Sequence, residues 1–142
     1  MEDVFQKLMI RAYYPVLYLH SYEYYRTKQK IKGIVELLRR EGKKVNYYQW
    51  DCVYGLVQIL PDKTEKRIER MQNPLEVLAY ILNSKKSGEK NIFVLDDINN
   101  HIDRDEVKLM FRKIAEATNN NTHAIILSSI YRLPAELEKT TS

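Results

Sequence analysis

Cysteine and histidine are scarce in this chain of 142 residues, and their scarcity excludes two kinds of structural support. The single cysteine, Cys52, cannot form a disulfide within the chain, and three scattered histidines show no zinc-binding spacing. A single domain of this length buries roughly 70% of its unfolded surface, so a hydrophobic core is enough to stabilise residues 1–142. Since no disulfide within the chain is needed or possible, we expect a reducing, cytoplasmic environment.

Long uninterrupted hydrophobic runs are also absent. The chain begins with Met1-Glu2-Asp3, and polar residues at positions 6, 7 and 11 interrupt the apolar residues that follow. A signal peptide needs a continuous apolar stretch, and a membrane-spanning helix needs about 20 apolar residues. We therefore expect a soluble protein without membrane association.

Glycine is rare, with four residues at positions 33, 42, 55 and 88. A phosphate-binding loop of the form G-x-x-x-x-G-K-S/T needs glycines, because only they let backbone N–H groups surround the phosphates, and a lysine that reaches the terminal phosphate. Residues 20–27, which follow the first predicted strand, have neither glycine nor lysine where that loop needs them. The sequence therefore predicts no catalytic and no nucleotide-binding residue in this chain.

The positive charge is unevenly distributed along the chain. Residues 1–50 carry ten Lys or Arg against five Asp or Glu, whereas the remainder carries thirteen against fourteen. Most of the excess lies between Arg26 and Lys44, where we predict a helix and its exit. This pattern indicates a solvated helix face, with a surface for phosphates or an acidic partner as the alternative. Nucleic acid is not the expected partner, because the spacing of an RNA-binding module is absent.

Hydrophobic periodicity predicts alternating helices and strands. Apolar strands are predicted at 16–20, 45–50, 91–98 and 124–127, and helices at 4–12, 22–41, 74–83, 104–118 and 133–137. Residues 53–72 are compatible with a hairpin or with an irregular excursion. The order predicts a three-layer α/β fold, in which helices cover both faces of a mostly parallel sheet of about four strands.

Local signals add detail to this pattern. Asn73, Pro74 and Glu76 together predict the start of a helix, with Asn73 as its N-cap. Asp103 is predicted to cap the helix that begins at 104. Trp50 and the neighbouring Cys52 are predicted to be buried.

Acidic residues follow two of the predicted strands. Asp96 and Asp97 follow the central strand, and Asp51 follows the second strand. In open α/β sheets, ligands bind at the carboxyl ends of the strands. An apolar strand that ends in two acids is also typical of the Walker B element, which holds Mg²⁺ in nucleotide-binding proteins. Asp96 and Asp97 are therefore candidate metal ligands.

Several segments together resemble the amino-terminal part of a family of AAA-type ATPases found in chloroplast genomes, cyanobacteria and other prokaryotes. The segments are residues 11–19, 48–51, 73–76, 93–97, 126–129 and 133–139. The order of these segments carries the resemblance, since each alone is short. In that family a degenerate P-loop-like domain with an AAA/RecA-like fold precedes the active AAA module.

The resemblance implies roles for residues at the strand ends. Asp96 falls at the position of the Walker B acid that binds Mg²⁺, and Asp97 at the position of the water-activating acid. Ser128 or Ser129 falls where a polar residue lies near the terminal phosphate. No residue falls on the Walker A lysine or on an arginine finger. The resemblance thus implies a non-catalytic regulatory or protein-interaction domain, with ATP and Mg²⁺ expected only in an attached AAA module.

Two other hypotheses remain open from the residues alone. Asp51, Asp96 and Asp97 all follow strands, so they could form a divalent-metal site for phosphoryl transfer or nuclease activity. Nucleotide binding through a non-standard loop is the second hypothesis.

The predicted sheet lacks a strand after Leu137. In the AAA strand order 5-1-4-3-2, a missing fifth strand leaves the first strand at the sheet edge, where unpaired backbone groups can pair with another chain. We therefore expect a fragment of a longer protein, or a homo-oligomer that pairs through this edge.

Overall fold

The computed structural model describes residues 16–21, 24–84, 89–116 and 121–129. Its elements in chain order are β1 (Val16–Ser21), α2 (Tyr24–Arg40), β2 (Val45–Asp51), β3 (Gly55–Ile59), β4 (Glu65–Glu69), α3 (Pro74–Ser84), β5 (Lys90–Asp96), the 3-10 helix η3 (Ile98–His101), α4 (Asp105–Glu116) and β6 (Thr122–Ser129). The predicted helices at 4–12 and 133–137 lie outside the described residues. Among those that are described, no helix is long and apolar enough to cross a membrane.

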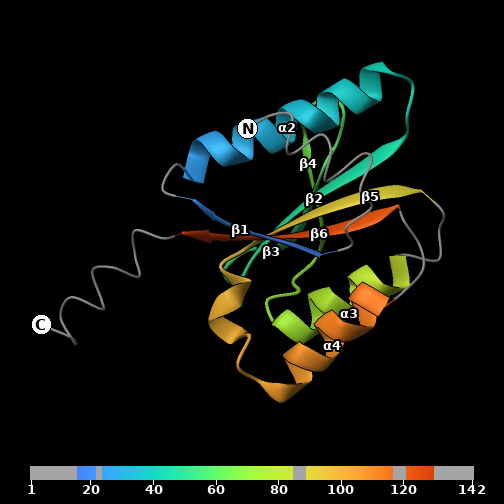
Figure 1. Ribbon diagram of the computed structural model, residues 1–142. Helices are drawn as coiled ribbons and strands as arrows, with labels where there is room; N and C mark the ends of the chain where they lie inside the picture. Colours follow the sequence, from blue (N-terminus) through green and yellow to red (C-terminus); the bar gives the residue numbers. More distant parts are fainter. Residues whose placement is uncertain (1–15, 22–23, 85–88, 117–120, 130–142) are drawn as a thin grey trace, which may run out of the picture.

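The sheet has six strands in the order β1-β6-β5-β2-β3-β4. The strands β1, β6, β5 and β2 are parallel to one another, and β3 and β4 join them as antiparallel strands (Figure 1). The parallel strands thus follow the order 1-4-3-2 that the resemblance implies, with β1 at one edge of the described sheet. The prediction of about four strands is wrong, because residues 53–72 contribute two more.

The additional strands form a hairpin, which decides between the two readings of this segment. β4 has the sequence Glu-Lys-Arg-Ile-Glu and lies at the other sheet edge. Charged residues on an edge strand discourage pairing with further chains, but they also remove the apolar alternation by which a strand is recognised in a sequence. The sequence therefore indicates the hairpin only through the apolar residues of β3 and the turn residues that follow them.

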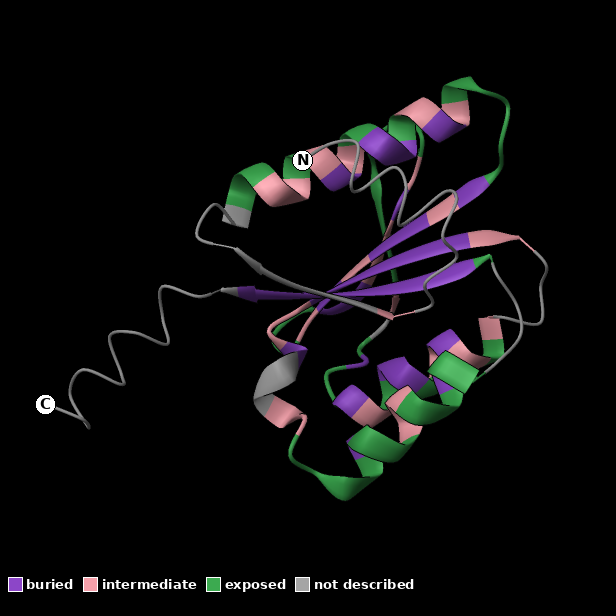
Figure 2. Ribbon diagram, viewed as in Figure 1, coloured by how far each residue is buried: buried purple, intermediate pink, exposed green. Residues whose placement is uncertain are grey.

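Helices cover both faces of the sheet, as predicted. α2 lies on one face, and α3 and α4 lie together on the other (Figure 1). Alternate side chains of β5 point to opposite faces of the sheet. Ile92 and Val94 pack with the buried residues of α2, whereas Phe93 and Leu95 pack with those of α3 and α4. All four side chains are fully buried, and Figure 2 shows the central strands as the most buried part of the fold. Asp96, the next residue of β5, follows Leu95 and so belongs to the α2 face.

Two of the local predictions are confirmed and two are wrong. Asn73 caps α3, because its Oδ1 accepts a hydrogen bond from the backbone N–H of Leu75 at 2.9 Å. Trp50 is buried, but Cys52 is exposed, since it lies in the turn that follows β2 rather than in the strand. The helix α4 begins at Asp105, one residue later than predicted, so Asp103 does not stand at its cap position.

Arg39 joins the end of α2 to two strands. Its Nη2 donates to the carbonyl oxygens of Val45 at 2.9 Å and Ile59 at 3.1 Å. We expect Arg39→Ala to lower the free energy of unfolding by about 1.5 kcal/mol, because both carbonyls lose a charged donor. Urea denaturation measures this loss. Arg40→Ala is the matched control, since Arg40 is exposed, and equal losses in the two variants would contradict the role of Arg39.

Candidate functional site

The carboxyl ends of β2 and β5 lie side by side at one edge of the sheet. Asp51 is the last residue of β2, and Asp96 is the last residue of β5. Trp50 pairs with Leu95 in register, so the two aspartates that follow them occupy neighbouring positions. On the other side of β5, Asp96 pairs with Leu127 of β6. The structure therefore brings the predicted strand-end acids to a common edge.

Asp96 forms an ion pair with a lysine of α2. The Nζ atom of Lys28 lies 2.8 Å from Oδ2 of Asp96, and the two side chains are only 20% and 12% exposed. The pair exists because α2 crosses the face of the sheet to which Asp96 belongs, with its first turns over the carboxyl edge. At this distance and with little water present, the ammonium group offsets most of the charge of the carboxylate.

A buried tyrosine lies close to the ion pair. The pKa of Tyr47 is raised to about 12, mainly by burial, and the negative charge of Asp96 contributes to the rise. The Nε2 group of Gln49 donates a hydrogen bond of 3.0 Å to the Tyr47 hydroxyl, which favours the phenolate and acts in the opposite direction. The surroundings of Asp96 on the α2 face are thus enclosed and poorly hydrated.

Asp51 is engaged in the turn between β2 and β3. Its Oδ1 accepts hydrogen bonds from the backbone N–H groups of Val53 at 2.8 Å and Tyr54 at 2.7 Å. Gly55, with a φ of 83°, completes the turn in a conformation that favours glycine. The carboxylate of Asp51 therefore has a structural use that is sufficient to explain its position.

Asp97 marks the point where the chain leaves the sheet. Its φ is 55°, a left-handed conformation that aspartate tolerates better than most residues. Its backbone N–H donates to the carbonyl oxygen of Leu127 at 2.9 Å, and η3 follows directly. This turn separates Asp97 from the regular alternation that positions Asp96.

Ser128 does not share a face with Asp96. Along β6, Ile125 and Leu127 pack on the α2 side of the sheet, while Ala124 and Ile126 pack on the side of α3 and α4. The alternation places Ser128, which is 5% exposed, on the side of α3 and α4. The side chain of the other predicted serine, Ser129, lies outside the described residues.

Comparison with known proteins identifies the family of this chain. Residues 5–142 match the family described as the N-terminal domain of SpoVK-like AAA ATPases. The chain belongs to this family. The match spans nearly the whole chain and confirms the resemblance to an amino-terminal part of AAA-type proteins.

A curated relative of the SpoVK-like domain is the "Uncharacterized AAA domain-containing protein ycf46" of Guillardia theta. The two sequences are 26% identical over 133 residues, which is 92% of this chain and 24% of the relative. The chain thus spans about a quarter of the length of that relative. No solved structure matches the chain.

The described part of the SpoVK-like domain does not favour a divalent cation at Asp96. One carboxylate oxygen already contacts the ammonium group of Lys28. Within residues 16–21, 24–84, 89–116 and 121–129, no three His, Cys, Asp or Glu side chains are grouped as metal ligands. A site for phosphoryl transfer or nuclease activity on Asp51, Asp96 and Asp97 has no support in this arrangement. Metal binding by Asp96 and Asp97 stays a prediction that requires a titration.

Sequence reasoning missed Lys28, the residue that forms the ion pair with Asp96 at the carboxyl end of β5. It is one of several cations in the first half of α2, and no local pattern distinguishes it from Arg26, Lys30 or Lys32. A search for lysines on the helix after the first strand would have included Lys28 as a candidate. Only the path of α2 across the sheet shows that Lys28, among these cations, reaches Asp96.

Proposed function

We propose that this chain is a P-loop-like domain without catalytic activity, which serves an AAA-type ATPase as a regulatory or protein-interaction module. The observation that carries the proposal is the ion pair of Lys28 with Asp96. In a Walker-type site the corresponding acid acts on Mg²⁺ directly or through water. Here the ammonium group of Lys28 contacts that carboxylate, at the position where a metal ion would bind.

Two further observations support the proposal. The sequence contains no G-x-x-x-x-G-K-S/T loop, so it lacks the glycines and lysine that normally surround the phosphates. The parallel strands nevertheless follow the order expected of a P-loop-like sheet. A domain that keeps the strand order while Lys28 offsets the charge of its acid fits a role as a binding surface for other proteins. In this proposal ATP and Mg²⁺ are used by an AAA module elsewhere in a cytoplasmic protein.

Calorimetric titration tests this function. The purified chain is titrated with ATP and with ADP, each with and without Mg²⁺, and with Mg²⁺ or Mn²⁺ alone. We expect no heat of binding and no thermal shift in any of these titrations, because Lys28 already occupies Asp96.

Two variants identify the site if binding does occur. Asp96→Asn removes the candidate ligand, and Asp105→Asn removes an exposed acid at the start of α4 as the matched control. Nucleotide binding that is weakened by the first variant and not by the second would overturn the proposal in favour of a non-standard nucleotide site. Binding of Mn²⁺ alone with the same dependence would overturn it in favour of a metal site.

A further inference from the structure

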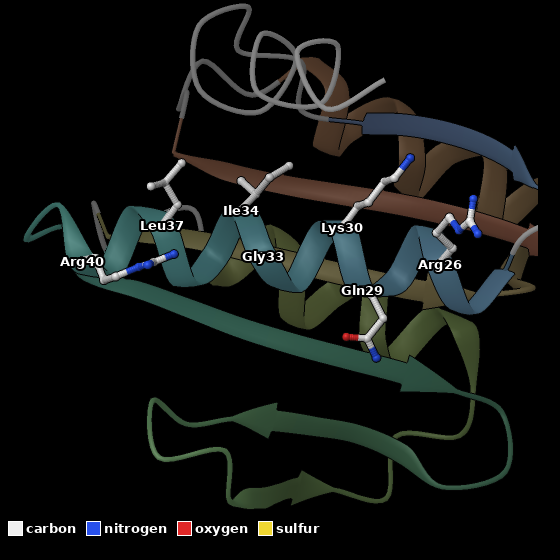
Figure 3. A pocket seen from close by; sticks show the side chains of 7 residues that line it. All are labelled: Arg26, Gln29, Lys30, Gly33, Ile34, Leu37 and Arg40. Atoms are coloured by element: carbon white, nitrogen blue, oxygen red, sulfur yellow. The ribbon is translucent and has the colours of Figure 1, made fainter.

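A groove runs along α2 on the outside of the sheet (Figure 3). Its volume is about 500 Å³. The described residues that line it all belong to α2 and are Arg26, Gln29, Lys30, Gly33, Ile34, Leu37 and Arg40. Their spacing of three and four residues is that of a single helix stripe, so the groove follows the helix axis.

The lining combines positive charge with an apolar floor. Arg26, Lys30 and Arg40 supply three cationic groups. The apolar residues of the lining are Ile34, which is only 5% exposed, and the half-buried Leu37. Figure 3 shows their side chains pointing to the same side of the helix as that of Lys30. An occupant that complements this lining has both acidic and apolar groups.

Gly33 lies in the middle of the helix stripe that lines the groove. A Cβ atom added to Gly33 would meet no atom of the described residues within 4 Å, so their packing does not require glycine there. Glycine in the interior of a helix is less favourable than alanine. Its presence therefore lowers helix stability and leaves open the space that a side chain would fill.

The dimensions of the lining favour an elongated occupant. Arg26 and Arg40 are separated by about 21 Å along the helix, from the rise per residue. A small molecule is held by polar groups that converge on it, whereas these cations are spread along the stripe. A nucleic acid strand would place phosphates against Ile34 and Leu37, where they find no hydrogen-bond donors. An amphipathic helix places apolar residues on the floor and acids beside the cations.

We propose that this groove is the docking site for an acidic amphipathic helix of a separate protein chain. The inference rests on the proposed function as an interaction module, and it assigns that function to the stripe from Arg26 to Arg40. Leucine side chains of the incoming helix pack on Ile34, Leu37 and the space above Gly33. Its flanking glutamates pair with Lys30 and Arg40.

Fluorescence anisotropy with a defined peptide tests the groove. The probe is a fluorescein-labelled synthetic helix of about 18 residues, long enough to span the stripe, with leucines at helical spacing on one face and glutamates on the other. A scrambled peptide of the same composition, without an apolar face, is the peptide control. A labelled single-stranded oligouridine of similar length tests for RNA.

Matched protein variants separate the groove from general electrostatic attraction. The double variant Lys30→Glu with Arg40→Glu reverses two cations of the groove, and Lys32→Glu with Lys113→Glu reverses two cations outside it. Both double variants lower the net charge equally. We expect the amphipathic peptide to bind about tenfold more weakly to the first and within about twofold of the wild type to the second.

Gly33 provides a test of shape. Gly33→Leu fills the groove and is expected to weaken binding of the peptide by about tenfold, while circular dichroism and the melting temperature show that the fold is retained. Gly33→Ala is expected to raise the melting temperature, since it improves the helix without a clash.

The outcomes distinguish this inference from the proposed function. Equal binding of the amphipathic and scrambled peptides, or equal effects of the two charge reversals, would overturn the groove as a helix site. Tighter binding of the RNA than of the peptide would overturn it in favour of nucleic acid. If neither peptide nor nucleotide binds, the groove inference fails and the non-catalytic function stands. Nucleotide binding in the calorimetric titration refutes the proposed function whatever the peptide does.

Discussion

Replacing Lys28 with methionine is expected to lower the free energy of unfolding by about 3 kcal/mol, the range found when one partner of a buried ion pair is removed. Asp96 is only 12% exposed and lies 2.8 Å from the ammonium group, so without Lys28 its charge stays in a poorly hydrated place. Methionine keeps most of the length and apolar surface of the lysine side chain, which limits the effect to the charge. Chemical denaturation at neutral pH measures the change.

The pair between Lys44 and Glu89 is the matched control. Its Nζ to Oε2 distance of 2.9 Å is nearly the same, but its side chains are 81% and 37% exposed. Lys44→Met is therefore expected to cost far less, because water replaces the lost partner. A loss as large as that of Lys28→Met would show that burial does not decide the effect.

A double variant completes the test of the ion pair. Adding Asp96→Asn to Lys28→Met removes the charge that was left behind, and we expect it to restore most of the lost stability. Additive losses in the double variant would mean that Lys28 and Asp96 stabilise the fold independently, and the ion pair would then not explain the position of either residue.

The central parallel strands β5 and β6 could be predicted from the sequence because they are buried on both faces. Residues 91–95 and 124–127 are buried without exception, and such runs have few alternatives to a covered parallel strand. The start of α3 was equally predictable, since Asn73 and Pro74 act through local backbone geometry. These signals depend on neighbours in the chain, which a sequence shows directly.

The missed features depend on contacts between distant parts of the chain. Lys28 and Asp96 are 68 residues apart, and their pairing follows from the path of α2 across the sheet. β4 is held by backbone pairing with β3 and needs no apolar pattern of its own. Cys52 lies only two residues after the buried Trp50, but the turn held by Asp51 exposes it. Residue type alone does not distinguish such outcomes.

Tyr47 should make the domain lose stability in alkaline solution. Burial raises the pKa of its phenol from 10.0 to about 12, and the charge of Asp96 acts in the same direction. The folded state therefore keeps the neutral phenol between these values, whereas the unfolded state ionises, so this contribution is complete below pH 10 and is lost as the pH rises towards 12. The loss reaches about 2 kcal/mol by pH 12, since one pKa unit corresponds to about 1.36 kcal/mol.

Tyr47→Phe isolates this contribution from the other groups that titrate at high pH, including the buried Tyr48, whose pKa burial also raises. At neutral pH the variant is expected to be about 1 kcal/mol less stable than the wild type, because the amide of Gln49 loses its acceptor. Since phenylalanine does not ionise, the two stability curves should cross at about pH 11, with the variant more stable above it. Urea denaturation across this pH range measures both curves.

Tyr54→Phe, which alters an exposed tyrosine, should follow the wild type throughout. Parallel curves for Tyr47→Phe and the wild type would show that the phenol ionises as readily in the folded state as in the unfolded state, and the enclosed environment inferred beside Asp96 would then be wrong.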